Sequence, residues 1–442
     1  MNKIMIVFFA FFIAVAMPLH AYAYETPILV DVNDELSAAV IHDTMVPIIS
    51  VDFAFPGGIT QDPEDKLGRA NLFTNLLTQG AGDLNSTAFQ KELNDLSISL
   101  SFNAGRDYIT GSLVTLKKNK ARAFELLKMV LTQPRFEESD VVRKKQSIMA
   151  GIRQNQASPS WLMWRNFNDY FYGDHPYTKP GQGTLETVPL ITSDDLRLYA
   201  GDVFVQNGLL ISVAGDVEAD EIAHDLRTVF GDLPTGEARP DIMPVPFNKG
   251  GDTYHVTLDV PQTFIVMGRS IDIDENDPDW AAAMVANYLI GGGGFSSALM
   301  DNVRAEKGLT YGISSSLMTQ KYGDVMVVQT STAHDKVDAM HAGINETLND
   351  VVHNGFDTDK VEAAKAYLVG SMPLSLTSTG AFSGLYLSLQ MEGLPLDYLQ
   401  QREDAIKAVT RDDVQRVATR LIGDMGFVTI TVGRDAAVKT SE

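Results

Sequence analysis

The sequence predicts an α+β protein with two tandem homologous domains, each formed by helices packed on a mainly antiparallel sheet. The prediction depends first on a repeated pattern, because residues 49–55 and 263–268 are both apolar runs typical of buried strands. Each run leads through an acidic loop that contains proline into an apolar helix that ends at a glycine. The matching residues Leu77 and Leu289 lie 289 − 77 = 212 positions apart. This offset indicates duplication of one structural unit.

The elements that follow also correspond in the two halves. Each half continues with a second short helix, then with alternating strands, and then with an amphipathic helix. The short helices are expected at residues 86–96 and 297–304, and the amphipathic helices at residues 120–131 and 336–352. The shared order of elements supports the duplication.

A segment rich in proline separates the two halves. Residues 234–251 contain Pro234, Pro240, Pro244 and Pro246 among glycines and polar residues, which is typical of a linker. We therefore expect an N-terminal domain at residues 24–233 and a C-terminal domain at residues 252–437. The hydrophobic content of 45% is sufficient for two packed cores.

The first 23 residues are predicted to be a secretory signal peptide. Lys3 precedes an apolar run at residues 4–17, and Ala21-Tyr22-Ala23 is a cleavage site of the small-x-small type. The alternative is an uncleaved anchor, but the run is shorter than the roughly 20 residues that a bilayer span needs. The chain has no cysteine, which excludes disulfides and a lipid-modified cysteine. We expect an exported protein of a Gram-negative periplasm, with no membrane span after cleavage.

The charge of the chain restricts its partners. There are 57 acidic and 35 basic residues, and the formal net charge is −22. A nucleic-acid-binding protein needs a basic surface for the phosphate backbone, so nucleic acid is excluded as a partner. Proteins and peptides remain.

A glycine-rich segment in the second half is the most informative part of the chain. A predicted helix at residues 280–290 ends at four consecutive glycines, and Ser296 or Ser297 is expected to cap the next helix. Gly308 is expected to end that second helix. The alternation that follows predicts a strand that includes Tyr311, so Arg304 and Tyr311 should lie on either side of one corner between a helix and a strand.

Arginine and tyrosine at such a corner suit a peptide carbonyl or an oxyanion. The guanidinium of Arg304 has several fixed donors, and the phenol of Tyr311 has one O–H donor. From the spacing alone, an arginine that caps a helix and a half-buried tyrosine that packs remain the more common alternative.

The motif Gly-Gly-Gly-Phe-Ser-Ser-x-Leu followed by Arg-x-x-x-Gly-Leu-x-Tyr resembles the second-domain signature of the pitrilysin or insulinase family of zinc metallopeptidases. The resemblance implies that Arg304 and Tyr311 hold substrate beside a zinc ion. It also implies a substrate-binding segment made of Gly292, Gly293, Gly294, Phe295 and Ser296. Two further segments, at residues 175–196 and 207–217, resemble the first domain of the same family.

The zinc-binding motif of the family is missing. Active members carry H-x-x-E-H on a first-domain helix and a further glutamate roughly 75 residues later. In this chain Asn71 and Asn75 stand at the histidine positions, Thr74 stands at the glutamate position, and the third ligand falls at Ala150 or Gly151. Carboxamides are poor zinc ligands, and threonine is no general base at neutral pH. We therefore expect no metal or other cofactor in this chain.

No other catalytic site is indicated. The eight histidines form no H-x-x-x-H pair, and His334 and His341, seven positions apart, are interpreted as solvated residues on a helix face. His175, which begins a His-Pro-Tyr turn, is interpreted as structural. The chain also has no Gly-x-Ser-x-Gly elbow, no phosphate loop and no cysteine nucleophile.

The resemblance supplies a leading hypothesis and an alternative. In short-chain members of the family, two chains of about this size form a clamshell, and some pairs divide the work between a zinc-bearing chain and a chain bearing Arg and Tyr. This chain would be the non-zinc subunit, half of such a clamshell, and Arg304 and Tyr311 would act in trans beside the zinc of an H-x-x-E-H partner. The alternative is a catalytically silent peptide-binding or assembly protein, as a homodimer.

Overall fold

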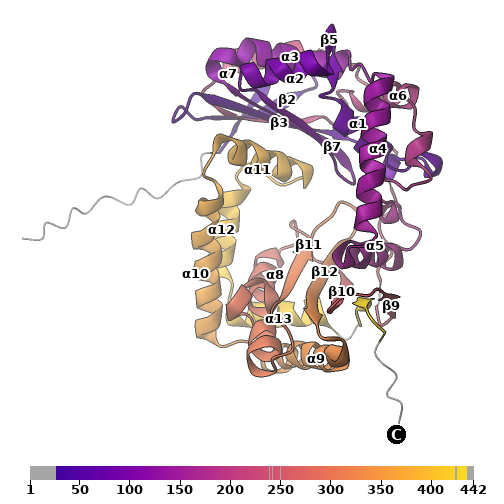
Figure 1. Ribbon diagram of the computed structural model, residues 1–442. Helices are drawn as coiled ribbons and strands as arrows, with labels where there is room; N and C mark the ends of the chain where they lie inside the picture. Colours follow the sequence, from indigo (N-terminus) through magenta and orange to yellow (C-terminus); the bar gives the residue numbers. More distant parts are fainter. Residues whose placement is uncertain (1–25, 238, 241, 249, 424–425, 436–442) are drawn as a thin grey trace, which may run out of the picture.

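The computed structural model describes residues 26–237, 239–240, 242–248, 250–423 and 426–435. The predicted signal peptide at residues 1–23 lies outside the described residues. The described chain forms two layered halves, with the N-terminal half above the C-terminal half in Figure 1. None of the described helices is long and apolar enough to cross a membrane.

A six-stranded sheet forms the centre of the N-terminal half, with strand order β1-β2-β8-β3-β7-β6. Its pairs are antiparallel except for β2 with β8. The strands are β1 (Ile28–Asp31), β2 (Ser37–His42), β3 (Ile48–Pro56), β6 (Ser99–Ala104), β7 (Tyr108–Leu116) and β8 (Leu210–Gly215). A small hairpin of β4 (Gly80–Ala81) and β5 (Leu84–Asn85) lies apart from this sheet.

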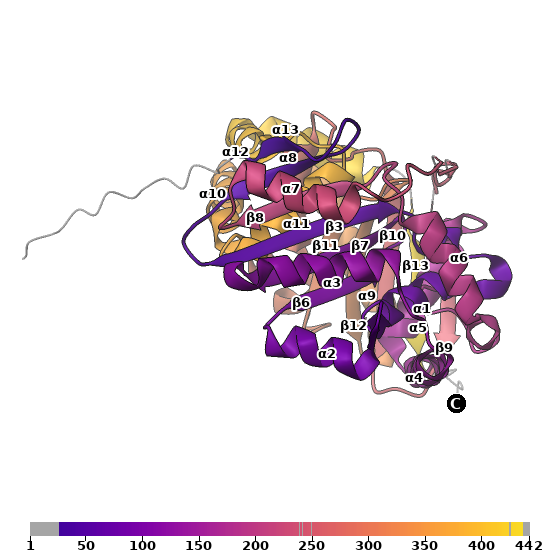
Figure 2. The same ribbon diagram turned by 90° about the horizontal axis from the view of Figure 1, so that it is seen from above.

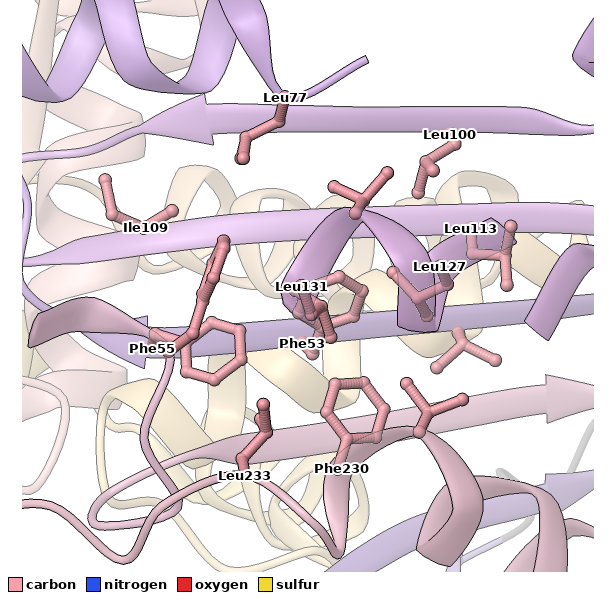
Figure 3. Packing of buried hydrophobic residues seen from close by; sticks show 14 of the residues in the cluster. Phe53, Phe55, Leu77, Leu100, Ile109, Leu113, Leu127, Leu131, Phe230 and Leu233 are labelled. Carbon is pink, nitrogen blue, oxygen red and sulfur yellow. The ribbon is translucent and has the colours of Figure 1, made fainter. Parts of the chain in front are cut away.

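Helices cover the outer face of this sheet, where α3 and α7 lie across the strands in Figure 2. The helices of this half, apart from α5, are α1 (Arg69–Leu76), α2 (Ser86–Asp95), α3 (Lys120–Thr132), α4 (Glu138–Asn155), α6 (Ser193–Val203) and α7 (Ala219–Phe230). Between the helices and the sheet lies an aromatic and aliphatic core (Figure 3). The ring of Phe53 contacts Phe230 edge-on, with 5.3 Å between the ring centroids, so the apolar run of β3 is buried as predicted.

The C-terminal half repeats this plan with a five-stranded sheet of order β11-β12-β10-β13-β9. Only β9 and β13 pair in parallel. The strands are β9 (Thr253–Thr257), β10 (Thr263–Ile271), β11 (Ile313–Met318), β12 (Asp324–Thr332) and β13 (Val428–Gly433). The helices, apart from α11, are α8 (Trp280–Asn287), α9 (Val337–Asn354), α10 (Thr358–Ser375), α12 (Tyr398–Ala408) and α13 (Arg411–Ile422).

Two helices cross between the halves. Helix α5 (Pro159–Tyr172) packs on β10 and β13 of the C-terminal sheet, where Gly268 leaves room for the ring of Phe167. Helix α11 (Thr379–Met391) packs on β3 and β8 of the N-terminal sheet (Figure 1). The hydroxyl of Ser383 on α11 bonds to the buried carboxylate of Asp52 on β3. Each sheet is therefore covered on one face by a helix from the other half.

The predicted α+β fold with helices on mainly antiparallel sheets is confirmed. The short and amphipathic helices lie within a few residues of the predicted ranges. The helix predicted at residues 280–290 differs, because its α-helical part ends at Asn287 and the chain continues as a wider π turn at Tyr288–Gly292.

Candidate functional site

The glycine-rich segment makes a tight corner against β11. After the π turn, a short 3₁₀ turn spans Gly294–Ser296, and a second π-helical segment spans Met300–Glu306. Gly291 is buried, and a Cβ atom there would lie 2.5 Å from the backbone nitrogen of Ser315. Gly294 has a φ of +57°, which favours glycine. Gly291 therefore serves close packing against the strand.

The predicted substrate-binding residues form the outer side of this corner. Gly292, Gly294, Phe295 and Ser296 are exposed, and Gly293 is half-buried. Phe295 is 73% exposed, which is unusual for a phenylalanine. A side chain that is open to solvent at a glycine corner is available to a ligand.

The predicted serine cap is wrong. The hydroxyl of Ser297 donates to the carbonyl oxygen of Gly294 at 2.7 Å, so it turns back toward the glycines. Ser297 still occupies the start of the helix, since its carbonyl oxygen accepts a hydrogen bond from the N–H of Asp301. Gly308 has a φ of +61° and follows the end of this helix as predicted.

Two contacts hold the side chain of Arg304 at the corner. Its Nε donates to the carbonyl oxygen of Tyr311 at 3.2 Å, and its guanidinium lies 4.8 Å from the ring centre of Phe295. No carboxylate of the described residues forms an ion pair with it, so its two terminal nitrogens are available to a ligand. The structure thus brings together Arg304, Tyr311 and Phe295.

The side chain of Tyr311 is 87% exposed. The prediction that it lies within the strand is wrong, because β11 begins at Ile313 and Thr310 makes a turn in which its hydroxyl accepts from the N–H of Gly312. Because of this turn, Tyr311 lies before the strand and does not follow the alternating inward and outward pattern of its side chains. Its phenol consequently projects into solvent near Arg304, as expected of a ligand-binding side chain.

A cavity of about 550 Å³ opens at this corner. Its lining includes Arg304, Tyr311, Thr310, Gln262 and Lys336. No local pattern indicated that Gln262 and Lys336 contribute, because they lie just before β10 and in the turn before α9. The cavity offers two cations and hydroxyl and amide groups, a set that can bind the carbonyl or carboxylate oxygens of a peptide.

The four positions of the missing zinc site lie in the other half, on α1 and on α4, which packs against it. Asn75 donates through Nδ2 to the backbone oxygen of Asn71 at 2.8 Å and to its Oδ1 at 3.1 Å. Thr74 is buried and donates to the same backbone oxygen at 3.1 Å. Gly151 has no atom within 4 Å of the place where a Cβ would lie. These side chains bond to one another and to the backbone.

The donor chemistry of this helix does not fit zinc. Zinc prefers imidazole, thiolate or carboxylate ligands, and Asn71, Thr74, Asn75 and Gly151 supply none of them. Within the described ranges there is also no group of three or more histidine, cysteine, aspartate or glutamate residues arranged to hold a metal ion.

A buried carboxylate holds the start of α1 in place. Asp62 accepts hydrogen bonds from the backbone N–H groups of Gly68 and Ala70, both at 3.0 Å. Burial raises the pKa of Asp62 from 3.8 to about 6, although these hydrogen bonds and Arg69 oppose the shift. The carboxylate therefore stabilises the start of the helix.

The histidines have structural contacts. His175 is buried, bonds through Nε2 to the carbonyl oxygen of Met243 at 3.0 Å, and accepts from the N–H of Tyr177. The interpretation as a solvated helix-face residue is wrong for His334, whereas His341 lies on α9 as expected and is half-buried. His334 lies in a turn and bonds to Thr263 and to the backbone of the chain at residue 260, while burial lowers the pKa of His341.

Comparisons with known proteins identify the family to which this chain belongs. Residues 37–184 match the family described as "Insulinase (Peptidase family M16)", and residues 190–368 match "Peptidase M16 inactive domain". The chain belongs to the insulinase-like M16 family. The two matches together span both the helix at Asn71 and the corner at Arg304.

Individual M16 relatives match nearly the whole chain. A Helicobacter pylori protein named "Non-peptidase homolog YmxG" is 24% identical over 88% of this chain and 90% of its own length. A Pseudomonas fluorescens structure titled "peptidase M16 inactive domain" has a TM-score of 0.87 at 23% identity, covering 94% of this chain and all of that one. The periplasmic protease PqqL of Escherichia coli has a TM-score of 0.79 at 13% identity, and the match covers 93% of this chain but 47% of that one. These structural matches support the M16 fold.

Proposed function

We propose that this chain is the non-zinc subunit of a heterodimeric zinc metallopeptidase, and that it supplies Arg304 and Tyr311 in trans. The observation that carries the proposal is an asymmetry between the halves. The helix at Asn71 has no zinc ligand, whereas the half-buried Arg304 and the exposed Tyr311 line one cavity of about 550 Å³. A catalytic zinc ion would therefore come from a partner chain with H-x-x-E-H.

The length of the chain supports a paired assembly. The match to PqqL covers nearly all of this chain but less than half of that protein. One chain of this size therefore corresponds to about half of a longer M16 molecule, and a second chain would supply the rest. The predicted signal peptide and the periplasmic location in the PqqL title favour a periplasmic complex.

The Arg304 and Tyr311 side chains would act on the scissile peptide group. The terminal nitrogens of Arg304 donate hydrogen bonds to the substrate carbonyl, and the phenol of Tyr311 donates to the oxygen as it gains negative charge. Gly292, Gly293, Gly294, Phe295 and Ser296 would form the neighbouring surface for the substrate backbone. The partner's zinc would activate the attacking water.

A second candidate function is a catalytically silent peptide-binding or assembly protein, present as a homodimer. The name of the Helicobacter pylori relative, a non-peptidase homologue, favours it. In that case the cavity at Arg304 would bind peptides without turnover, and no zinc-bearing partner would exist.

Purification of the tagged chain from its native periplasm distinguishes the two. The proposed function predicts that a chain with H-x-x-E-H copurifies in equal amount and that the pair cleaves peptides in a chelator-sensitive way. Recovery of a homodimer with no such partner and no peptidase activity would reject it in favour of the second candidate.

A further inference from the structure

A cavity of about 310 Å³ borders the helix at Asn71, on a different part of the molecule from Arg304. Helix α1 contributes Asn71, helix α5 contributes Trp161, Trp164 and Asn168, and the loop at residues 179–183 contributes Gln182. The volume lies at the lower end of the range for ligand-binding sites. It has room for roughly one or two amino-acid residues.

The contact with the C-terminal sheet fixes the tryptophans. Trp161, Trp164 and Asn168 recur at spacings of three and four residues and share one face of α5. Met163 and Phe167 are buried in the cluster on the C-terminal sheet. Because that contact anchors α5, both indoles are held half-buried at the cavity.

The opposite wall is fixed by close backbone packing. A Cβ at Gly68 would lie 2.7 Å from the backbone oxygen of Gln182, and a Cβ at Gly183 would lie 2.3 Å from the backbone oxygen of Leu67. Both glycines have positive φ values, +92° and +76°. The loop that carries Gln182 therefore rests directly on the start of α1, so the wall is rigid.

The polar groups of this cavity are donors. The side-chain oxygens of Asn71, Asn168 and Gln182 each accept an internal hydrogen bond; their donors are Asn75, Arg106 and Asn155. The NH₂ groups of the same three side chains have no hydrogen-bond partner within the described part of the chain, and neither do the two indole N–H groups. A ligand for this cavity must therefore supply acceptors.

The charge of the lining agrees with this requirement. Although the chain carries 57 acidic residues, no aspartate or glutamate lines the cavity, whereas Arg165 and Lys179 do. Arg165 is paired with Asp169, and Lys179 lies 3.4 Å from Glu64. Both cations are thus partly neutralised, and the recognition falls chiefly to the amide and indole donors.

We propose that this cavity binds a carboxylate of a peptide, with an aromatic or aliphatic side chain of the same peptide resting on the indoles. Carboxylate oxygens accept hydrogen bonds from the carboxamide NH₂ groups, and indole rings provide apolar surface for a neighbouring side chain. The position once suited to a zinc ligand would then recognise a peptide by its carboxylate. The carboxylate can come from the peptide C-terminus or from an acidic side chain. This proposal stands independently of the role of Arg304 and Tyr311.

Tryptophan fluorescence of the mature chain tests the proposal, because two of its three tryptophans line the cavity and the third, Trp280, is buried in the other half. Three probes are titrated: N-acetyl-Ala-Ala-Phe with a free carboxylate, its C-terminal amide, and N-acetyl-Ala-Glu-Phe amide. At least one carboxylate peptide should bind saturably and about tenfold or more tighter than the neutral amide. The peptide that binds identifies the carboxylate source. Equal binding of all three, or no saturable change with any, would overturn the proposal.

Asn71→Asp places a negative charge in the cavity with little change of shape, and should weaken carboxylate binding by about tenfold or more. The matched control is Asn94→Asp, on the exposed surface of α2, which should bind like the wild type. Gln182→Glu is the second cavity variant, used if Asn71→Asp lowers the melting temperature. Unchanged affinity in a folded cavity variant would also overturn the proposal.

Discussion

A helix followed by a glycine corner occurs in both halves of the molecule, but the polar side chains of the two corners make different contacts. On α1, Asn71, Thr74 and Asn75 bond to one another and to the backbone. At the C-terminal corner, Arg304 keeps two terminal nitrogens without a partner among the described residues, and Tyr311 projects into solvent. The comparison shows that the Arg304 corner presents cationic and phenolic donors to a ligand, whereas the polar side chains of α1 bond largely within the helix and the NH₂ group of Asn71 lies at the cavity beside α5.

The largest effect is expected from substitutions at the corner that carries Arg304 and Tyr311. In the complex with a zinc-bearing partner, Arg304→Ala or Tyr311→Phe should lower kcat by roughly 10²- to 10³-fold, as removal of an oxyanion donor does. Turnover and complex mass are measured on the same samples. Assembly should be unchanged, because Tyr311 is exposed and Arg304 contributes one hydrogen bond and one ring contact within the corner.

Matched controls remove an arginine side chain and a tyrosine hydroxyl at positions outside the corner. Arg434→Ala removes an exposed arginine, and Tyr170→Phe removes one hydroxyl from a partly exposed tyrosine. Both controls should keep the wild-type rate. Wild-type rates in correctly assembled Arg304 and Tyr311 variants would show that the corner has no role in catalysis.

A second prediction concerns helix α1, whose start depends on the buried Asp62. The folded-state pKa of about 6 lies above the ordinary value of 3.8, so the native state binds the proton more tightly than the unfolded state does. The contribution of Asp62 to stability is therefore present below about pH 4 and is lost as pH rises to about 6. Asp62→Asn cannot titrate, so relative to the wild type it should gain up to about 3 kcal/mol between pH 4 and pH 7.

Urea unfolding of both proteins across this pH range measures the difference. Asp65→Asn, which changes an exposed carboxylate of the same loop, is the control. A constant difference between Asp62→Asn and the wild type, or an equal pH dependence in the control, would contradict this assignment.

The smallest effects are expected from alanine substitutions at two glycines. Gly291→Ala should destabilise the chain by about 1–3 kcal/mol, because its Cβ would overlap the backbone of Ser315. Gly151→Ala should stabilise it by about 0.5–1 kcal/mol, since the position is helical and open. Thermal or urea unfolding gives both values. Similar effects at the two positions would remove the distinction between a constrained corner and an unconstrained helix.

Much of this architecture follows from local patterns. The apolar run of β3 and the periodicity of α3 and α9 predict their elements because burial imposes a period of two or about 3.6 residues. Gly308 was predictable as a helix end because it adopts a positive φ. The motif around Arg304 also predicted which residues meet at the corner.

Other features depend on contacts between distant segments. No local pattern specifies that α5 and α11 pack on the sheet of the opposite half, so the cavity that α5 helps to form could not be predicted. Lys336 lies at the cavity of Arg304 because the turn between β12 and α9 passes beside Gly308, whose carbonyl oxygen accepts from Lys336 Nζ at 3.4 Å. The π turns were missed because they depend on backbone hydrogen-bond register, and composition does not encode it.

We propose that the zinc half-site has been lost in this chain while the Arg304 and Tyr311 half-site serves a partner. The most direct test of this proposal combines elemental analysis and a peptide-library digest of the purified mature chain, alone and mixed with its H-x-x-E-H partner. We expect no stoichiometric zinc and no cleavage by the chain alone, and on mixing we expect chelator-sensitive cleavage that exceeds the activity of the partner alone. Bound zinc with chelator-sensitive cleavage by the chain alone would contradict it.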